Sequence, residues 1–259
     1  MSSEFNILVS ADYYDQFLEM FLHLGEPHYK WQRMSWPERD SRMPGMLADV
    51  DAIISRMNLQ DEDYLAANRL KLLQVPTSGY DHIDLQCASR HGVFVANNGG
   101  ANAISVSDHV FMFILCIYRR LLFHHHAVTK GPWVNLKYEN IELCGKRIGI
   151  VGLGNVGKQV AMRASCFGMD VVYYDIIRPD PKFDRKYSLN FKSFKEVLSI
   201  SDIVTFHVPL TELTENMINS HSLGLMKNGA ILINTSRGKI QDEEALYEAL
   251  SSGKLKGAG

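Results

Sequence analysis

Three glycines, Gly152, Gly154 and Gly157, fall at the spacing G-x-G-x-x-G directly after the short apolar run Ile148–Val151. The run is typical of a buried strand, and small or apolar side chains recur at helical spacing after the last glycine. At such a turn the first glycine permits a tight bend, the second lets a pyrophosphate approach the backbone, and the third lets the helix pack closely on its strand. The spacing therefore predicts a dinucleotide-binding turn, with phosphates at the start of the helix.

A second strand is predicted over Asp170–Tyr174, and Asp175 follows it. In dinucleotide-binding folds, an acidic residue roughly 20 residues after the glycines hydrogen-bonds the adenosine ribose. A carboxylate repels the additional phosphate of NADP, so Asp175 favours NAD. Arg178 weakens this preference for NAD, because an arginine beside the acid can pair with the additional phosphate of NADP.

Composition limits the classes of protein that fit. The 259 residues are 46% hydrophobic and 22% charged, which indicates a soluble globular chain long enough for two domains. A formal net charge of −2 argues against binding to nucleic acid or to a membrane surface. The four cysteines (Cys87, Cys116, Cys144, Cys166) have no metal-ligand spacing, and the consecutive His124–His126 cannot converge on one ion. No leader pattern is visible, and we expect a cytoplasmic protein with reduced thiols in apolar settings and no metal site.

The first hundred residues alternate strands and helices, which predicts a parallel sheet with helices on both faces. The expected strands are Phe5–Val9, Asp51–Ile54, Leu72–Val75 and Val93–Val95, and the expected helices are Tyr14–Leu24 and Asp61–Leu70. The segment Asn97–Asn102 breaks this alternation with residues that tolerate unusual backbone conformations. We place the domain boundary there, giving domains of residues 1–98 and 99–259.

One long helix is expected from Ala103 to Ala127, and its apolar body favours burial between domains or subunits. Its most apolar part, Val110–Phe123, is too short to span a bilayer and contains Arg119 and Arg120. Trp133 on the following loop fits either a core or an oligomer interface.

Polar residues follow several predicted strands at their carboxyl ends, where open α/β sheets bind ligands. His207 comes after the strand Ile203–Phe206, and the pattern is equally consistent with a ligand contact and with a hydrogen-bonded structural residue. Arg237 follows Ala230–Asn234 on a glycine-containing turn, where it suits bidentate binding of a carboxylate. The polar loop Pro76–Asp84 is either a plain turn or a ligand loop.

Five ordered motifs run the length of the chain: Ser78–Asp84, Asn98–Asn102 with Ser105–His109, Gly152–Gly157, His207–Thr211 and Ile233–Gly238. In these motifs the sequence resembles the NAD-dependent D-2-hydroxyacid dehydrogenases, which include phosphoglycerate, glyoxylate/hydroxypyruvate and formate dehydrogenases. Asp108 stands where most members carry glutamate. The resemblance implies an α/β chain of two doubly wound parallel-sheet (Rossmann-like) domains that transfers a hydride between NAD and a small 2-hydroxy or 2-keto acid. The first domain would be flavodoxin-like and bind substrate, without its C-terminal return segment.

The resemblance also implies roles for individual residues. Arg237 would be the catalytic residue that binds the substrate carboxylate and orients the keto group, with Ser78, Gly79, Tyr80 and Asn102 completing the substrate site. The expected cofactor contacts are Val106, Gly152, Gly154, Asn155, Val156, Gly157, Asp175, His207, Val208, Pro209, Thr214, Thr235, Ser236 and Arg237. A homodimer through residues 103–146 is expected as well.

In this family a general-acid/base histidine, its partner glutamate and an aspartate at the nicotinamide lie beyond the motif that ends at Gly238. Residues 1–259 stop before them, and none of His82, His109 and His207 matches that histidine's motif. The resemblance therefore implies a dehydrogenase with little turnover from residues 1–259 alone, because hydride transfer needs a proton acceptor. The alternatives are a non-catalytic NAD-binding sensor or dimerisation module and, more remotely, an NAD-binding corepressor.

The second domain is expected to be a dinucleotide-binding fold that lacks its last strands. The strand beginning near Gly257 would be cut off, which would leave Ile231–Ile233 on an exposed sheet edge. Such an edge pairs readily with other chains, so residues 1–259 are expected to aggregate.

Overall fold

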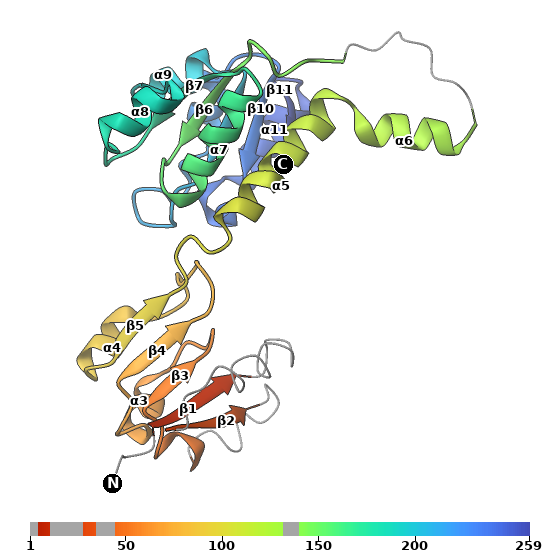
Figure 1. Ribbon diagram of the computed structural model, residues 1–259. Coiled ribbons are helices and arrows are strands. Elements are labelled where there is room, and N and C mark those ends of the chain that lie inside the picture. The colour runs from red at the N-terminus through yellow and green to blue at the C-terminus, as the bar shows by residue number, and fades with distance from the viewer. Residues whose placement is uncertain (1–4, 11–27, 35–44, 132–139) are drawn as a thin grey trace. The chain divides into compact units, whose positions relative to one another are not determined.

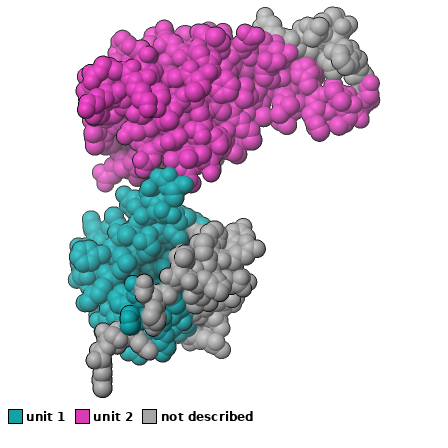
Figure 2. Space-filling view, viewed as in Figure 1, with its two compact units in different colours: residues 1–101 teal, residues 102–259 magenta. Residues whose placement is uncertain are grey.

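A computed structural model describes residues 5–10, 28–34, 45–131 and 140–259. The chain divides into two compact units, residues 1–101 and 102–259 (Figure 2). Each unit contains one parallel sheet with flanking helices (Figure 1), which confirms the predicted α/β fold class. The helix expected over Tyr14–Leu24 and the loop residue Trp133 lie outside the described residues.

The first unit has a five-stranded parallel sheet in the order β2-β1-β3-β4-β5. This is the strand order of flavodoxin-like folds. Its strands are β1 Phe5–Ser10, β2 Tyr29–Met34, β3 Ala52–Ile54, β4 Leu72–Val75 and β5 Phe94–Asn97, and its described helices are α3 Asp61–Ala66 and α4 Leu85–Arg90. β2 was not expected from the sequence, and among the described strands it pairs with β1 alone, at the margin of the sheet. Ile53 and Leu73 of the sheet form a buried core with Tyr64 of α3 and Cys87 of α4.

The second unit has a six-stranded parallel sheet in the order β11-β10-β9-β6-β7-β8. Its strands are β6 Arg147–Val151, β7 Asp170–Tyr174, β8 Asn190–Phe191, β9 Ile203–Phe206, β10 Ala230–Asn234 and β11 Leu255–Ala258. Its helices are α5 Ala103–Tyr118, α6 Leu121–Thr129, α7 Asn155–Cys166, α8 Pro181–Tyr187, α9 Phe194–Ile200, α10 Ser220–Leu225 and α11 Glu243–Ser251, with a 3₁₀ turn, η2, at Gly238–Ile240. The strand order reverses between β6 and β9, which is where dinucleotide folds bind their ligands.

Alternating side chains of the second sheet enter two different cores. Ile148 and Ile150 of β6 pack with α5 and α7 on one face, where Figure 1 shows these two helices side by side. Val151 belongs to the opposite core, which includes residues of α9, α10 and α11. Gly149 lies between them, and a Cβ there would be 2.7 Å from Val197 Cγ1 of α9. The missing side chain therefore lets α9 pack directly on the central strand.

The long helix expected over Ala103–Ala127 is in fact two helices. α5 ends at Tyr118 and α6 begins at Leu121, because Arg120 takes a left-handed conformation (φ 48°) that a right-handed helix cannot continue. Burial is also one-sided: Ile114 is fully buried, whereas Ile104 is 59% exposed. The helix is thus covered on one face only by the described residues, and its expected burial between domains or subunits stays a prediction.

The strand β10 is not a sheet edge. β11 pairs with β10 in parallel. The amide of Asn234 donates to the carbonyl oxygen of Gly259 (2.8 Å), and the amide of Gly259 donates to the carbonyl oxygen of Leu232 (3.0 Å). Ile231–Ile233 are at most 1% exposed. The prediction of an exposed apolar edge is thus wrong, because the few residues from Leu255 onward suffice to complete the ladder, and the expected aggregation loses its physical basis.

The four cysteines have free thiols in different environments. Cys87 is buried and Cys116 is partly buried, but Cys144 and Cys166 are exposed, so the expectation of apolar settings is wrong for the latter two. α9 begins with a capping box, since the side chains of Ser193 and Glu196 each bond the other residue's backbone amide. Within the described part of the chain, every helix is too short or too polar to pass through a bilayer.

Candidate active site

The three glycines of the loop between β6 and α7 have three different surroundings. Gly152 has φ +93°, and a Cβ there would lie 2.7 Å from the carbonyl oxygen of His207. A Cβ on Gly157 would collide with the carbonyl oxygen of Gly152, so its absence sets the close packing of α7 on β6. Gly154 is the N-cap of α7, and a Cβ there would meet no described atom within 4 Å. Gly154 therefore leaves open space at a helix N-terminus, which fits a pyrophosphate.

Asp175 is fixed against this glycine loop. Its Oδ2 accepts a hydrogen bond from the amide of Leu153 (2.6 Å), and its Oδ1 accepts one from the amide of Ile177 (2.9 Å). The guanidinium of Arg178 stacks on Phe191, 3.9 Å from the ring centroid. The acid at the end of β7 is thus oriented by the loop that precedes α7, while Arg178 has an aromatic partner on β8.

His207 follows β9 and lies beside the glycine loop. Its Nε2 is 2.9 Å from the hydroxyl oxygen of Thr205, and Val208 Cγ1 is 2.9 Å from the position of a Cβ on Gly152. Burial lowers the pKa of His207 to about 3, so the imidazole is neutral at physiological pH. The sequence was equally consistent with a ligand contact and with a structural role for His207. The contact with Thr205 gives the imidazole a structural partner at the switch point.

The pKa of His207 predicts an acid-sensitive fold. Between pH 6.5 and about 3 the unfolded chain binds a proton at this histidine and the folded chain does not. The free energy of unfolding should therefore fall as pH drops below 6.5, by at most about 1.4 kcal/mol per pH unit from this group. Urea unfolding at pH 7 and pH 5 measures the slope, and His207→Gln should flatten it. If His207→Gln showed the same dependence of unfolding free energy on pH, the lowered pKa of His207 would not be its cause.

The turn after β10 is organised by Asn234. Its Nδ2 donates to the carbonyl oxygen of Arg237 (2.9 Å) and to Gln241 Oε1 (3.1 Å), and its Oδ1 accepts from the Ser236 amide and hydroxyl. Nη1 of Arg237 donates to the Ser236 carbonyl (2.8 Å). The hydroxyl oxygen of Thr235 is buried and has no hydrogen-bond partner among the described residues. A polar ligand at this turn would supply that partner.

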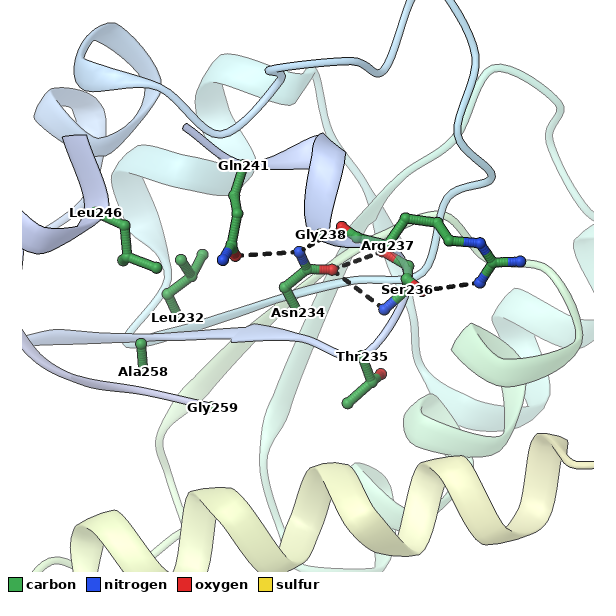
Figure 3. Close-up of a pocket in the computed structure, with 10 residues that line it drawn as sticks. All are labelled: Leu232, Asn234, Thr235, Ser236, Arg237, Gly238, Gln241, Leu246, Ala258 and Gly259. Carbon is green, nitrogen blue, oxygen red and sulfur yellow. Dashed lines mark hydrogen bonds between the residues drawn. The ribbon is translucent and has the colours of Figure 1, made fainter. Parts of the chain in front are cut away.

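A hollow of about 530 Å³ lies at the carboxyl end of β10 (Figure 3). It is lined by Leu232, Asn234, Thr235, Ser236, Arg237, Gly238, Gln241, Leu246, Ala258 and Gly259. In Figure 3 the guanidinium of Arg237 points away from Asn234 and Gln241. Gln241 and Asn234 were not identified from the sequence. Asn234 could have been, because it is the last residue of a strand whose carboxyl end faces a ligand region.

Other predicted cofactor residues occupy the same unit. Asn155 and Val156 form the first turn of α7, directly after Gly154. Val106 lies in α5, in the turn that follows its N-cap Asn102. The hydroxyl of Thr214 donates to the carbonyl oxygen of Pro209 (2.6 Å) and accepts from the Thr211 amide (2.8 Å), so this side chain shapes the loop after His207.

Three predicted substrate residues, Ser78, Gly79 and Tyr80, lie in the first unit on the loop after β4, whereas Asn102 is the N-cap of α5 in the second unit. The Ser78 hydroxyl donates to the Asn98 carbonyl (2.9 Å), and Thr77 Oγ1 donates to the Gly79 carbonyl (2.9 Å). Asn97 Nδ2 donates to the Ser78 carbonyl (2.7 Å), and Tyr80 is 42% exposed. These bonds give the loop a defined backbone conformation at the carboxyl end of a parallel strand.

Comparison with known proteins identifies the family. The model of the D-isomer specific 2-hydroxyacid dehydrogenase NAD binding domain matches residues 111–259, and the chain belongs to this family. A glyoxylate reductase of Korarchaeum cryptofilum is 37% identical over 217 residues, 82% of this chain and 65% of that protein. A hydroxypyruvate reductase of Thermotoga maritima is 37% identical over 224 residues, 86% of this chain and 72% of that protein.

A crystal structure of D-lactate dehydrogenase from Aquifex aeolicus, complexed with NAD and lactic acid, superposes with a TM-score of 0.82 at 30% identity. The match covers 98% of this chain and 76% of that one. The chain spans slightly less than two thirds of the length of the Korarchaeum reductase. The second unit is therefore an NAD-binding domain, and its glycine loop, Asp175 and the Thr235 hydroxyl fit that cofactor.

Proposed function

We propose that this chain belongs to an NAD-dependent dehydrogenase that interconverts a D-2-hydroxy acid and a 2-keto acid. The observation that carries the proposal is the arrangement at one end of the second sheet. The open glycine loop follows β6, and Asp175 follows β7. Arg237 lies on the turn that follows β10. A cofactor cradle and a carboxylate-binding cation at the same edge suit hydride transfer to or from a small acid.

The proposed reaction converts a D-2-hydroxy acid and NAD⁺ into a 2-keto acid, NADH and a proton. NAD, when bound at the glycine loop, would supply the hydride chemistry. Arg237 binds the substrate carboxylate through its planar guanidinium and holds the neighbouring carbon in one orientation. His207, neutral and bonded to Thr205, fills the end of β9 without adding charge. We assign the proton transfer to no described histidine.

NAD preference over NADP follows from Asp175, whose carboxylate would repel a 2′-phosphate. We expect clearly tighter binding of NAD than of NADP in calorimetric titrations. Asp175→Ala should narrow the gap by removing the repulsion, whereas the exposed Glu248→Ala on α11 should leave it unchanged. Tighter NADP binding by the unaltered protein, or a gap that survives Asp175→Ala, would contradict this role.

We also propose a homodimer through residues 103–146. α6 has no buried residue within its own chain, and Leu122 on it is 79% exposed and Val128 73% exposed. Apolar side chains that are exposed together on one helix favour a protein partner. Sedimentation equilibrium should give twice the chain mass of 29.3 kDa, and Leu122→Glu should shift the mass toward that of one chain. A monomer at micromolar concentration would contradict the proposal.

A non-catalytic NAD sensor remains the second candidate from the sequence. Both readings predict NAD binding, so binding alone does not separate them. An assay of NADH oxidation separates the two functions, with the product of the native gene as the enzyme and glyoxylate, hydroxypyruvate and pyruvate as acceptors. The dehydrogenase proposal predicts acceptor-dependent oxidation, and NAD binding without any such oxidation supports the sensor.

A further inference from the structure

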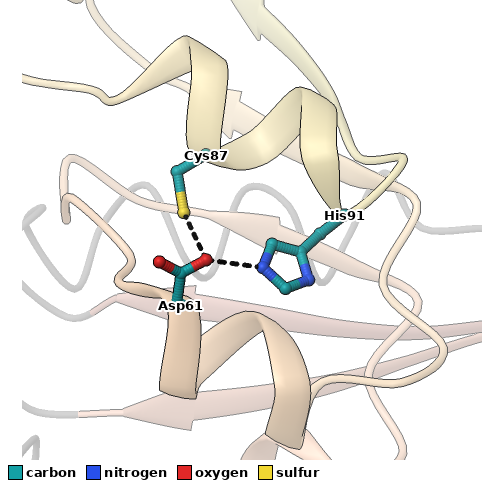
Figure 4. A group of neighbouring side chains, drawn as sticks. All are labelled: Asp61, Cys87 and His91. Atoms are coloured by element: carbon teal, nitrogen blue, oxygen red, sulfur yellow. Dashed lines mark hydrogen bonds and ion pairs between the residues drawn. The ribbon is translucent and has the colours of Figure 1, made fainter.

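The first unit contains a second cluster of chemically active side chains, which the dehydrogenase reaction does not use. Asp61, at the first position of α3, lies against Cys87 and His91 of the neighbouring α4 segment (Figure 4). Cys87 Sγ is 3.4 Å from Asp61 Oδ1, and His91 Nε2 is 2.8 Å from the same oxygen. One potential ligand atom from each residue lies within 4.8 Å of the other two. We call these three residues the Asp61–Cys87–His91 cluster.

We propose that the Asp61–Cys87–His91 cluster is a binding site for a zinc-class divalent cation. A thiolate, an imidazole and a carboxylate are the three ligand types that zinc accepts, whereas Mg²⁺ and Ca²⁺ prefer oxygen alone. In a tetrahedral zinc site with ordinary bond lengths, neighbouring ligand atoms stand about 3.4–3.6 Å apart. The Sγ–Oδ1 distance of 3.4 Å already has this value, and the 2.8 Å between His91 Nε2 and Oδ1 would lengthen by about half an ångström on binding.

The helical register and the neighbouring residues prepare this geometry. Cys87 and His91 are four residues apart, so one helical turn places them on the same side of α4. The ring of Tyr64 stacks on the imidazole of His91, with centroids 5.1 Å apart and planes inclined by 12°, which fixes the ring plane. Arg90 Nη2 lies 3.4 Å from Asp61 Oδ1 and 3.3 Å from Oδ2, so a cation on Oδ1 would leave this ion pair to Oδ2 alone.

The exposure of the cluster suits a cation site with one open position. Cys87 is 3% exposed, whereas the side chains of His91 and Asp61 are 21% and 61% exposed. Solvent therefore reaches the carboxylate side, and a water molecule can serve as the fourth ligand. On binding, the thiol proton passes to the buffer and the sulfur bonds the cation as thiolate. The expectation of no ligand spacing at the cysteines overlooked His91, four residues after Cys87, and Asp61 is brought to this pair only by the packing of α3 on α4.

A bound cation would act on the loop that precedes α4. Asp84, the last residue of that loop, caps α4 by accepting a hydrogen bond from the amide of Cys87 (2.8 Å). The same residue that bonds the cation thus also anchors the loop carrying Ser78–Tyr80. We expect the cation to tie α3 to the start of α4 and to stabilise the first unit against unfolding.

Cobalt(II) chloride is the spectroscopic probe, because a Co²⁺–thiolate bond gives a charge-transfer band in the near ultraviolet. Titration of the chelator-treated protein should produce this band with one Co²⁺ per chain, and zinc chloride should abolish it. Cys87→Ala should remove the band and weaken zinc binding at least about 10-fold. Cys166→Ala, which removes an exposed thiol of the second unit, should leave both unchanged.

The absence of a thiolate band in the unaltered protein would overturn the proposal, and so would a band that persists in Cys87→Ala or disappears in Cys166→Ala. Binding without thiolate character would indicate other histidines, such as the exposed His125 on α6, and would count against the cluster. If circular dichroism shows that Cys87→Ala is unfolded, His91→Gln decides: zinc affinity about 10-fold lower supports the site, and unchanged affinity overturns it.

Discussion

Gly154→Ala should weaken NAD binding by about 10–100-fold while leaving the fold intact, since forcing a methyl group against a bound phosphate costs about 1–3 kcal/mol. Gly154 has φ −75°, which alanine adopts freely, and a Cβ there meets only open space. The loss should therefore appear in calorimetric titrations with NAD and not in thermal unfolding. Gly224→Ala on α10, where a Cβ also meets nothing within 4 Å, is the matched control: it should leave NAD binding unchanged and, because alanine is the better helix former, should not lower the stability.

Gly157→Ala should behave differently, because its methyl group would collide with the Gly152 carbonyl inside the protein. We expect a loss of about 1–3 kcal/mol in the free energy of unfolding, together with weaker NAD binding as α7 shifts. The two variants separate a glycine that makes room for the cofactor from one that permits packing. An unstable Gly154→Ala, or a Gly157→Ala as stable as the unaltered protein, would show that the loop does not have this arrangement.

Arg237→Lys should lower kcat/KM for 2-keto acids by about 10–100-fold in the product of the native gene, because a hydrogen-bonded charge pair is worth about 1.5–3 kcal/mol. Lysine retains the charge but loses the planar pair of donors that matches a carboxylate. The dissociation constant for NAD should change much less. Arg185→Lys, at an exposed position of α8, serves as the control.

An Arg237→Lys variant that loses NAD affinity as strongly as substrate turnover would place this side chain against the cofactor alone. A variant with full turnover would exclude a substrate role. Both outcomes are read from the same pair of measurements, steady-state kinetics and calorimetry. The control variant then shows whether an arginine-to-lysine change at an unrelated place has any effect.

The strand-to-helix turn at Gly152 could be predicted from the sequence because its requirements are local. Gly152 is required by its backbone conformation, Gly154 by the open space beside it and Gly157 by the close packing of α7. The spacing of the three glycines therefore identifies the turn. The second strand and Asp175 follow for the same reason, since a short apolar run ends at a polar residue. The structure bears out these elements within one or two residues.

Features that depend on distant contacts could not be predicted. The sequence predicts a strand near Gly257 beside β10, but it does not show that Leu255–Ala258 is long enough to complete the backbone ladder with a segment about twenty residues away. The break between α5 and α6 depends on one left-handed residue, Arg120, whose side chain carries no signal for that conformation. The Asp61–Cys87–His91 cluster required the packing of two helices. The β11 pairing and the cluster rest on contacts between residues that no short sequence window contains, and the helix break rests on a backbone conformation that the residue type does not indicate.

The most direct test of the proposed function is the stereochemistry of the reaction with the product of the native gene. Incubation with NADH and hydroxypyruvate or pyruvate, followed by chiral separation of the product, measures the configuration of the hydroxy acid. The account predicts that NADH is consumed in equal amount to the acid formed and that the product is the D enantiomer. Formation of the L enantiomer, or tight binding of NAD with no hydroxy acid formed from any 2-keto acid, would contradict it.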